Sequence, residues 1–210
     1  ATAGQAPLYF TLGSAVVLTA PVAGVMETDA NGIPYYTHAT NERGIVDTEQ
    51  FVLPTATNTL SAQTAAQAIF DGVTANGAVT VASSKSYWFE CFWFCTNLVG
   101  AGRMGFAFGG GASFTSQSWW TIGRNTSSPT PATGAQTTFN TAANTNINNI
   151  GNGTQGIAFI NGVVRINNGG TLIPQISLTS SANAPVIGVD CYFRITPIGT
   201  NTVTTIGNWS

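Results

Sequence analysis

The segment that most limits the possible folds of this chain is a run of nine residues that is apolar on both sides. Residues 87–95 read YWFECFWFC. In a strand, successive side chains point to opposite faces. One face then carries Trp88, Phe92 and Phe94, with Glu90 among them, and the other carries the odd-numbered residues. Because such a strand is covered on both faces, we predict a sandwich core on one side and a helix or a neighbouring subunit on the other.

The composition favours an all-β chain with a neutral surface. Only 7% of the 210 residues are charged, against roughly 25% in an ordinary soluble domain. The chain has 31 Thr, 18 Asn, 14 Ser and 24 Gly. Strand-forming Thr and turn-forming Asn and Gly are thus abundant, while Lys, Glu and Arg, the usual builders of helix surfaces, are scarce. A surface with so little charge resists association weakly, which favours a chain that works inside an assembly.

The same composition excludes several classes of protein. Six Lys and Arg residues cannot supply the basic field that a nucleic-acid-binding protein needs. A hydrophobic content of 43% is too high for a disordered chain. No uninterrupted apolar run reaches the ~18 residues of a membrane span, so we expect no membrane insertion. The stretch from Ala1 to Gly4 has no basic segment before an apolar one, so we expect no secretory signal.

Strand patterns follow one another from Gly77 to the end of the chain. We predict strands over 78–81, 87–95, 103–108, 118–122, 157–166, 171–178, 186–196 and 202–206. Roughly eight strands at this spacing predict a β-sandwich or a jelly roll. One helix is predicted at Ser61–Asp71, because Ser61 suits an N-cap, an apolar stripe of helical spacing follows, and Gly72 is a stop signal.

The N-terminal quarter differs in composition from the rest. Six of the 14 charged residues lie between Glu27 and Glu49. The stretch Asp29–Gly32 contains Asn-Gly, which accepts positive φ at low cost and therefore predicts a hairpin, with Pro34–Thr37 as the returning strand. We predict that residues 1–55 form an extended arm with a hairpin that makes assembly contacts, and that residues 56–210 form the sandwich domain.

The three cysteines, Cys91, Cys95 and Cys191, predict buried, reduced thiols. Four residues of strand separate the first two by roughly 13 Å, which is too far for a disulfide. A bridge from Cys191 to one of the others is the alternative. The odd number of thiols and the single histidine of the chain do not favour a metal site, and we expect no cofactor.

For each candidate catalytic group, we favour a structural interpretation over a catalytic one. His38 is the one imidazole, and no nucleophile motif accompanies it, so a Ser-His-Asp triad is not favoured. Asp47 and Glu49 share a strand face, and Glu90 and Asp190 lie in apolar strands, so a carboxylate pair for glycoside hydrolysis is the competing interpretation. For Glu90 we favour a structural ion pair with Arg194, Arg165 or Arg103. The Gly109-Gly110-Gly111 segment predicts a tight turn and not a phosphate loop.

The pair Trp119-Trp120 predicts one outward indole. Adjacent strand residues point to opposite faces, so at most one of the two enters a sandwich core. An outward Trp among neutral amides and hydroxyls suits stacking on a sugar, and an interface or lid role is the alternative. We therefore take Trp119, Trp120 and Asn125 as candidate glycan or receptor contacts, and Trp88, Phe92 and Phe94 as the candidate trimer interface.

Three parts of the chain carry a resemblance to a known family. The first joins Ala6–Phe10 to Thr19–Glu27. The second comprises Leu60–Phe70, Asn76–Thr80 and Tyr87–Cys91, and the third runs from Tyr192 through Val203 to Gly207–Ser210. Together these parts resemble bacteriophage tail-fibre and minor virion structural proteins. The resemblance implies a trimeric jelly roll of the tumour-necrosis-factor or C1q type, preceded by a threaded N-terminal arm. It brings no catalytic motif.

These observations lead to a non-enzymatic virion protein as the expected function. We expect the distal domain of a homotrimeric fibre that attaches to the host surface, with a host glycan as a further ligand and other virion proteins bound through residues 1–55. The alternative is a decoration protein that stabilises a capsid or tail without binding a receptor. A glycan depolymerase is a third hypothesis, but the chain has few acidic residues from which to build a cleft.

Overall fold

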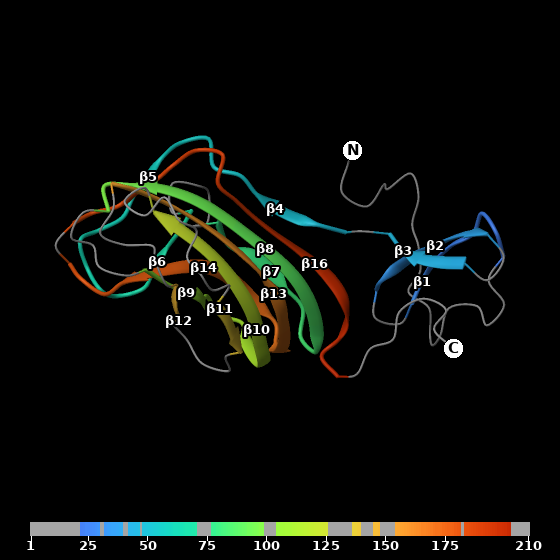
Figure 1. The fold of residues 1–210 in the computed structure, drawn as a ribbon. Coiled ribbons are helices and arrows are strands. Elements are labelled where there is room, and N and C mark those ends of the chain that lie inside the picture. Colours follow the sequence, from blue (N-terminus) through green and yellow to red (C-terminus); the bar gives the residue numbers. More distant parts are fainter. Residues whose placement is uncertain are drawn as a thin grey trace, which may run out of the picture.

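The described part of the chain consists of β-strands and turns (Figure 1). The structure is a computed structural model and describes residues 22–29, 32–39, 42–46, 48–70, 77–98, 104–125, 136–139, 145–147, 154–181 and 183–202. Within these ranges the strands form three antiparallel sheets. No helix in them is long and apolar enough to cross a bilayer.

The larger sheet has the order β11-β10-β13-β8 and continues on the other side of β8 with β15 and β16. Strands β15 and β16 lie end to end along that edge of β8, and β5 and β4 pair with their outer sides. The bounds of the strands are β4 (Gln50–Val52), β5 (Asn58–Thr59), β8 (Lys85–Thr96), β10 (Ser113–Asn125), β11 (Gln136–Phe139), β13 (Gln155–Asn168), β15 (Val186–Ile187) and β16 (Tyr192–Thr200).

The second sheet of the sandwich has the order β12-β9-β14, and β7 and β6 both pair with the free side of β14. Its strands are β6 (Gln67–Ala68), β7 (Val79–Val81), β9 (Met104–Gly109), β12 (Thr145–Ile147) and β14 (Gly170–Leu178). Two packed antiparallel sheets confirm the prediction of an all-β sandwich.

The strand order is that of a jelly roll. Eight consecutive strands, β7 to β14, divide into a β7-β14-β9-β12 sheet and a β8-β13-β10-β11 sheet. The first strand therefore pairs with the last and the second with the second to last, as two interlocked Greek keys require. Strands β4, β5, β15 and β16 widen the larger sheet beside β8, so that β8 becomes an interior strand.

Aromatic rings fill the space between the two sheets. Phe89 on β8 lies 4.9 Å from Phe108 and 6.2 Å from Phe106, both on β9, measured between ring centroids. Trp119 on β10 meets Phe106 edge to face at 5.6 Å, and Phe193 on β16 closes the cluster. Phe89, Phe106 and Phe193 are fully buried. The odd-numbered face predicted for residues 87–95 is therefore the core face.

The predicted glycine turn connects β9 to β10, across the two sheets. Gly110 has φ 103°, and a Cβ there would lie 2.3 Å from the carbonyl oxygen of Thr171. Only glycine fits both restrictions. Gly169 alone separates β13 from β14, which lie in different sheets.

The predicted helix at Ser61–Asp71 is wrong over the residues that the structure describes, 61–70. This segment bends and then forms β6, which pairs with Gln175 and Ile176 of β14. The side chain of Gln67 bonds both the N–H and the C=O of Ser61, at 2.6 and 3.0 Å, and so closes the bend. Isolated helices of this length are marginal, whereas the extended form buries Ile69 and Phe70 completely in the core.

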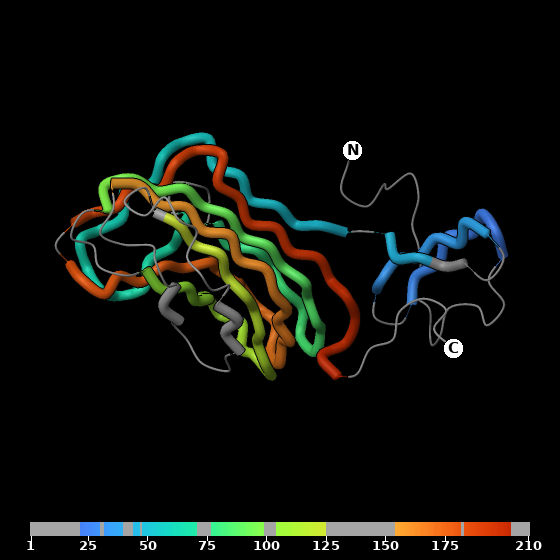
Figure 2. The backbone as a smooth tube through the Cα atoms, viewed as in Figure 1, coloured from blue at the N-terminus to red at the C-terminus, as the bar shows by residue number. Residues whose placement is uncertain are grey.

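A separate three-stranded sheet precedes the sandwich. It contains β1 (Met26–Thr28), β2 (Pro34–Ala39) and β3 (Glu42–Ile45), in that order, and it stands beside the sandwich at one end (Figure 2). The predicted hairpin is confirmed, since Asp29 accepts the N–H of Ile33 at 2.9 Å and Gly32 has φ 78°. Within the predicted arm, 22–46 are thus folded on themselves, while β4 belongs to the sandwich.

We expect Gly162→Ala to destabilise the sandwich by about 1–3 kcal/mol, as overpacking of a core does. Gly162 lies opposite Trp119 on the neighbouring strand, and a Cβ there would lie 2.3 Å from the carbonyl oxygen of Ser118. Denaturant unfolding followed by tryptophan fluorescence measures the change. Gly111→Ala is the matched control, because its Cβ would meet nothing closer than 3.7 Å. Equal midpoints for both variants would contradict the packing.

Candidate functional site

The side of the larger sheet that faces away from the core, here called the outer face, collects the residues predicted for an interface. Trp88, Phe92 and Phe94 of β8 all point there, opposite to the buried Phe89 and Trp93. Each of the three is half-buried. Within the described residues the second layer predicted for this face is neither a helix nor another strand.

An aromatic row crosses the outer face at right angles to the strands. Phe51 of β4 stacks on Tyr192 of β16 at 5.7 Å, and Tyr192 stacks on Phe92 of β8 at 5.8 Å. The strand register then places Phe159 of β13 next to Phe92. Phe159 in turn contacts Trp120 of β10, with ring centroids 5.7 Å apart. Residues far apart in the sequence thus form one continuous apolar band.

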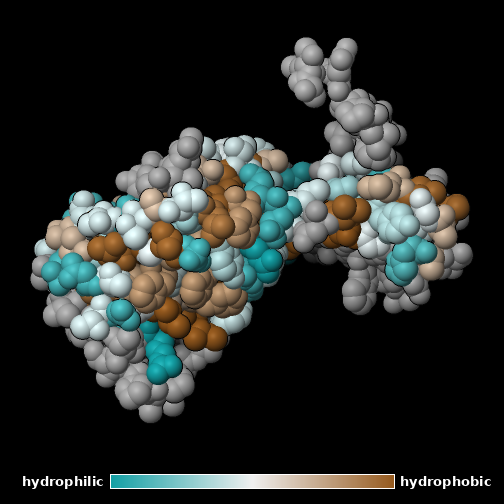
Figure 3. Space-filling model, turned by 90° about the horizontal axis from the view of Figure 1, so that it is seen from above, coloured by the Kyte–Doolittle hydropathy of each residue, from teal (hydrophilic) through white to brown (hydrophobic). Residues whose placement is uncertain are grey.

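Aliphatic side chains extend this band and are open to solvent. Ile122 is 53% exposed and lies opposite Phe159, and Ile157 is 42% exposed and lies opposite Phe94. Phe51 at the edge is 50% exposed. In the view of Figure 3, brown apolar side chains reach the surface of the sandwich beside a band of teal hydrophilic ones. Contiguous apolar surface of this kind marks an interaction site.

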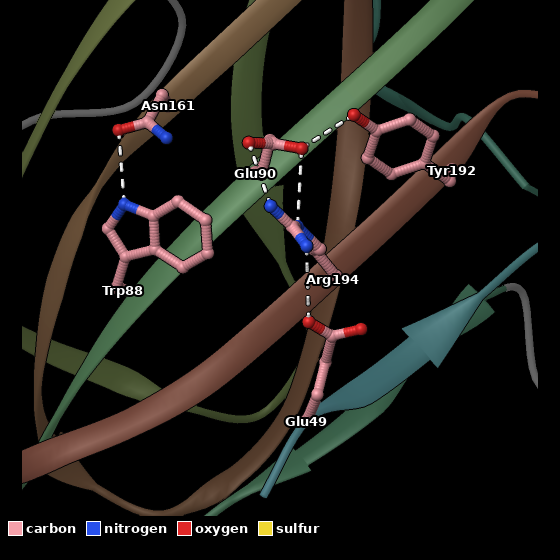
Figure 4. A network of polar contacts seen from close by, with 6 residues as sticks. All are labelled: Glu49, Trp88, Glu90, Asn161, Tyr192 and Arg194. Atoms are coloured by element: carbon pink, nitrogen blue, oxygen red, sulfur yellow. Dashed lines mark hydrogen bonds and ion pairs between the residues drawn. The ribbon is translucent and has the colours of Figure 1, made fainter. Parts of the chain in front are cut away.

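One charged group of residues interrupts the apolar face. The polar cluster, as we call it, consists of Glu49, Glu90, Tyr192 and Arg194 together with the indole of Trp88 (Figure 4). Arg194 contacts the two oxygens of Glu90 at 3.2 and 3.3 Å and Glu49 at 3.5 Å. The contact through its Nε is an ion pair without hydrogen-bond geometry. Of the three arginines predicted as partners of Glu90, Arg194 is confirmed.

The local register explains why these side chains meet. Arg194 lies directly opposite Glu90 on one side and Phe51 on the other. Its guanidinium carbon is 5.0 Å from the ring centroid of Trp88, which adds a cation–π attraction. The indole N–H of Trp88 donates to Asn161 at 3.1 Å. The Glu90 side chain is only 11% exposed, so its charge requires these partners.

The phenol of Tyr192 completes the cluster by donating to Glu90 at 2.5 Å. Burial, together with this hydrogen bond and the negative charge of Glu90, raises the pKa of Tyr192 to about 12. The phenol therefore stays protonated at neutral pH. The phenol of Tyr192 and the guanidinium of Arg194 thus both bind the Glu90 carboxylate, as in a structural ion pair.

The structure separates the two candidate tryptophans. Trp119 is 2% exposed and lies in the core, so it is not a surface contact. Trp120 is the outward ring and is half-buried against Phe159. It therefore lies on the same face as Trp88 and Phe92, and a glycan and a partner subunit would compete for it. Asn125 ends β10 opposite Gly156, and its side chain lies outside the described residues.

His38 and Asp190, two further candidate catalytic residues, do not belong to the polar cluster. His38 is exposed on β2 of the separate sheet, and Asp190 is exposed at the corner between β15 and β16, with φ 62°. Glu49 joins the polar cluster, and Asp47 lies outside the described residues.

The three thiols are free and buried, as predicted. Burial raises the pKa of all three, that of Cys95 to about 12. The Cys95 thiol donates to the carbonyl oxygen of Gly156 at 3.5 Å, and the Cys191 sulfur accepts from the N–H of Phe94 at 3.2 Å. No group of three His, Cys, Asp or Glu side chains in the described ranges is arranged to hold a metal ion.

Several residues of the outer face had no individual signal in the sequence. Tyr192, Phe159 and Phe51 come from three segments that become neighbours only through the pairing of β16, β13 and β4. The usable signal was alternation: Tyr192 and Arg194 alternate with the buried Phe193 and Ile195. Alternation assigns a face but does not give the neighbouring strand.

No family model, curated protein or solved structure matches the chain. The tumour-necrosis-factor or C1q type of jelly roll and the likeness to virion proteins stay predictions.

We expect folding stability to fall as the pH rises above about 9, where model thiols ionise. The raised pKa values of the three thiols and of Tyr87 and Tyr192 keep these groups protonated in the folded chain. The unfolded chain releases these protons at ordinary pKa values, so alkali favours unfolding. Urea midpoints between pH 7 and 11 measure the slope. Cys95→Ala should reduce the slope of the unfolding free energy against pH by the contribution of about one proton. An unchanged slope would contradict the burial of that thiol.

Proposed function

We propose that this chain is a non-enzymatic structural module that forms homotrimers through the outer face of its larger sheet and serves as the distal domain of a bacteriophage fibre. The observation that carries the proposal is the aromatic face around Trp88, Phe92 and Phe94, which no helix or second sheet of the described residues covers. Burying such a face in an assembly gains the transfer free energy of its rings.

The chemistry of the face favours a protein partner over a sugar. Sugar-stacking platforms combine aromatic rings with hydrogen-bonding groups. Here exposed aliphatic side chains, Ile122 and Ile157, continue the aromatic row. Tyr192, Trp88 and Arg194 are also residue types that supply most of the binding energy in protein interfaces.

Charge favours a second copy of the chain as that partner. Arg194 is paired within the chain with Glu90 and Glu49, so the face needs no strongly charged complement. A copy of this chain offers a surface that is equally poor in charge. The number of three copies and the place in a phage rest on the resemblance to virion proteins, and attachment to a host glycan rests on the neutral polar composition.

A capsid or tail decoration protein is the second candidate. The folded sheet of residues 22–46 favours it, because a compact module beside the sandwich suits clamping onto a neighbouring virion protein as well as continuing a shaft. Antibody labelling of intact particles distinguishes the two candidates by the position of the chain.

We expect the wild-type chain to have a mass near three chains by light scattering at low micromolar concentration, and Phe92→Glu to be a folded monomer. A glutamate at this position would place an unpaired charge inside the contact. Asn168→Glu is the control, because it adds the same charge at an exposed residue at the end of β13. Circular dichroism checks the fold. If the Phe92→Glu variant is still a trimer, the outer face is not the trimer interface.

Trp120→Ala separates the interface from receptor attachment. Trp120 continues the apolar row, so we expect a shift from trimer towards monomer in analytical ultracentrifugation, by about tenfold or more in dissociation constant, as for loss of an aromatic contact. Adsorption to host cells would then fall through lost avidity. An intact trimer with lost adsorption would instead assign Trp120 to a receptor site.

A further inference from the structure

We infer that the polar cluster around Glu90 and Arg194 fixes the single orientation in which copies of the chain pack. This inference rests on the proposed self-association through the outer face and adds what selects one arrangement among the many that apolar rings allow.

The position of the cluster makes it unavoidable for a partner. Glu90 lies on the interior strand β8, with Trp88 and Phe92 two residues away on either side along the same face. Across the strands it is flanked by Arg194 and Asn161. A copy that covers the aromatic row must therefore also approach the charges, and it cannot bury one without the other.

The cluster is satisfied on one side and open on the other. Glu90 is held by Tyr192 and Arg194, and only 11% of its side chain is exposed. Glu49 and Arg194 keep 31% and 35% of their side chains exposed. Two carboxylates share one guanidinium, so the open side of the cluster is the acidic one. It accepts a donor more readily than an apolar side chain.

A second polar atom lies beside the cluster. The hydroxyl of Thr196, opposite Trp88 and two residues beyond Arg194 on β16, is buried and has no hydrogen-bond partner. Because this hydroxyl is already buried within the chain, a neighbour cannot reach it, and Glu49 is the acceptor that a partner meets. An orientation that brings a polar donor of a neighbour to Glu49 satisfies that carboxylate. Orientations that cover Glu49 with apolar side chains leave its charge buried and incompletely compensated.

Polar groups inside apolar interfaces act in this way elsewhere. They weaken association but exclude wrong registers and wrong numbers of subunits, because every alternative leaves them unpaired. The expected role of the cluster is therefore selectivity and not affinity.

The test replaces three members of the cluster by apolar groups of similar size in the full chain: Glu90→Leu, Arg194→Met and Tyr192→Phe together. Native mass spectrometry reports the number of subunits. A nitroxide on Asn168→Cys, an exposed position at the end of β13, gives distances between subunits by pulsed electron paramagnetic resonance. The native thiols are buried and do not compete for the label. Asp190→Asn is the control, since it removes one negative charge at an exposed residue whose positive φ suits asparagine.

We expect the triple variant to associate at least as tightly as the wild type, but as a mixture of stoichiometries with several distances, while Asp190→Asn keeps one stoichiometry and one distance. A triple variant with the single stoichiometry and distance of the wild type would overturn the inference and leave the self-association standing. A folded monomer would also overturn it, because the cluster would then supply affinity. If the triple variant does not fold, Glu90→Gln is judged by the same two readouts. A wild-type chain that is monomeric at every concentration would instead overturn the proposed function, and the inference with it.

Discussion

Strand β8 carries apolar side chains on both faces, and the rest of the structure depends on how each face is covered. Its inner face, with Phe89 and Trp93, anchors the ring cluster that joins the two sheets. Leaving its outer face in contact with solvent would cost free energy, because apolar side chains would stay exposed to water. The widening of the larger sheet by β15, β16, β4 and β5 makes β8 an interior strand, so its backbone is paired on both sides, while its outer side chains Trp88, Phe92 and Phe94 stay half-buried.

The buried charge of Glu90 shows how such a face can still fold uniquely. A lone carboxylate on an apolar strand would cost several kcal/mol. Arg194 and Tyr192 meet it because β16 pairs with β8 in one register. A slip by one residue would turn Arg194 towards the core and leave Glu90 alone on the outer face. The ion pair therefore forms only when β8 and β16, which are about a hundred residues apart in the chain, pair in the correct register. We expect the ion pair to affect the register of these two strands more than the stability of the fold.

Much of this fold was accessible from residue patterns. The alternation in residues 87–95, the hairpin at Asp29–Gly32 and the glycine turn at 109–111 each depend on local geometry, and each is confirmed. The segment 61–70 failed because its helical spacing of Ala, Ile and Phe is local, whereas its pairing with β14 is not. The partner of Glu90 was limited to three arginines but not to one, because alternation gives the face and leaves the neighbouring strand open. For the same reason the pair at 119–120 predicted one inward and one outward indole without saying which.

The scarcity of charge and the apolar outer face have one common explanation. Charged surfaces keep proteins soluble and apart, and a chain that displays Ile122, Ile157 and Phe51 with so few charges would associate without control. In the assembly that we propose, the polar cluster in the middle of the face, together with the neutral amides and hydroxyls around it, provides that control. An assembly built from such a chain is held by apolar area, which changes little with salt. A few polar groups select one packing orientation of the copies, because any other orientation would bury these groups without hydrogen-bond partners. Stability and specificity of the assembly are then supplied by different residues of the same face.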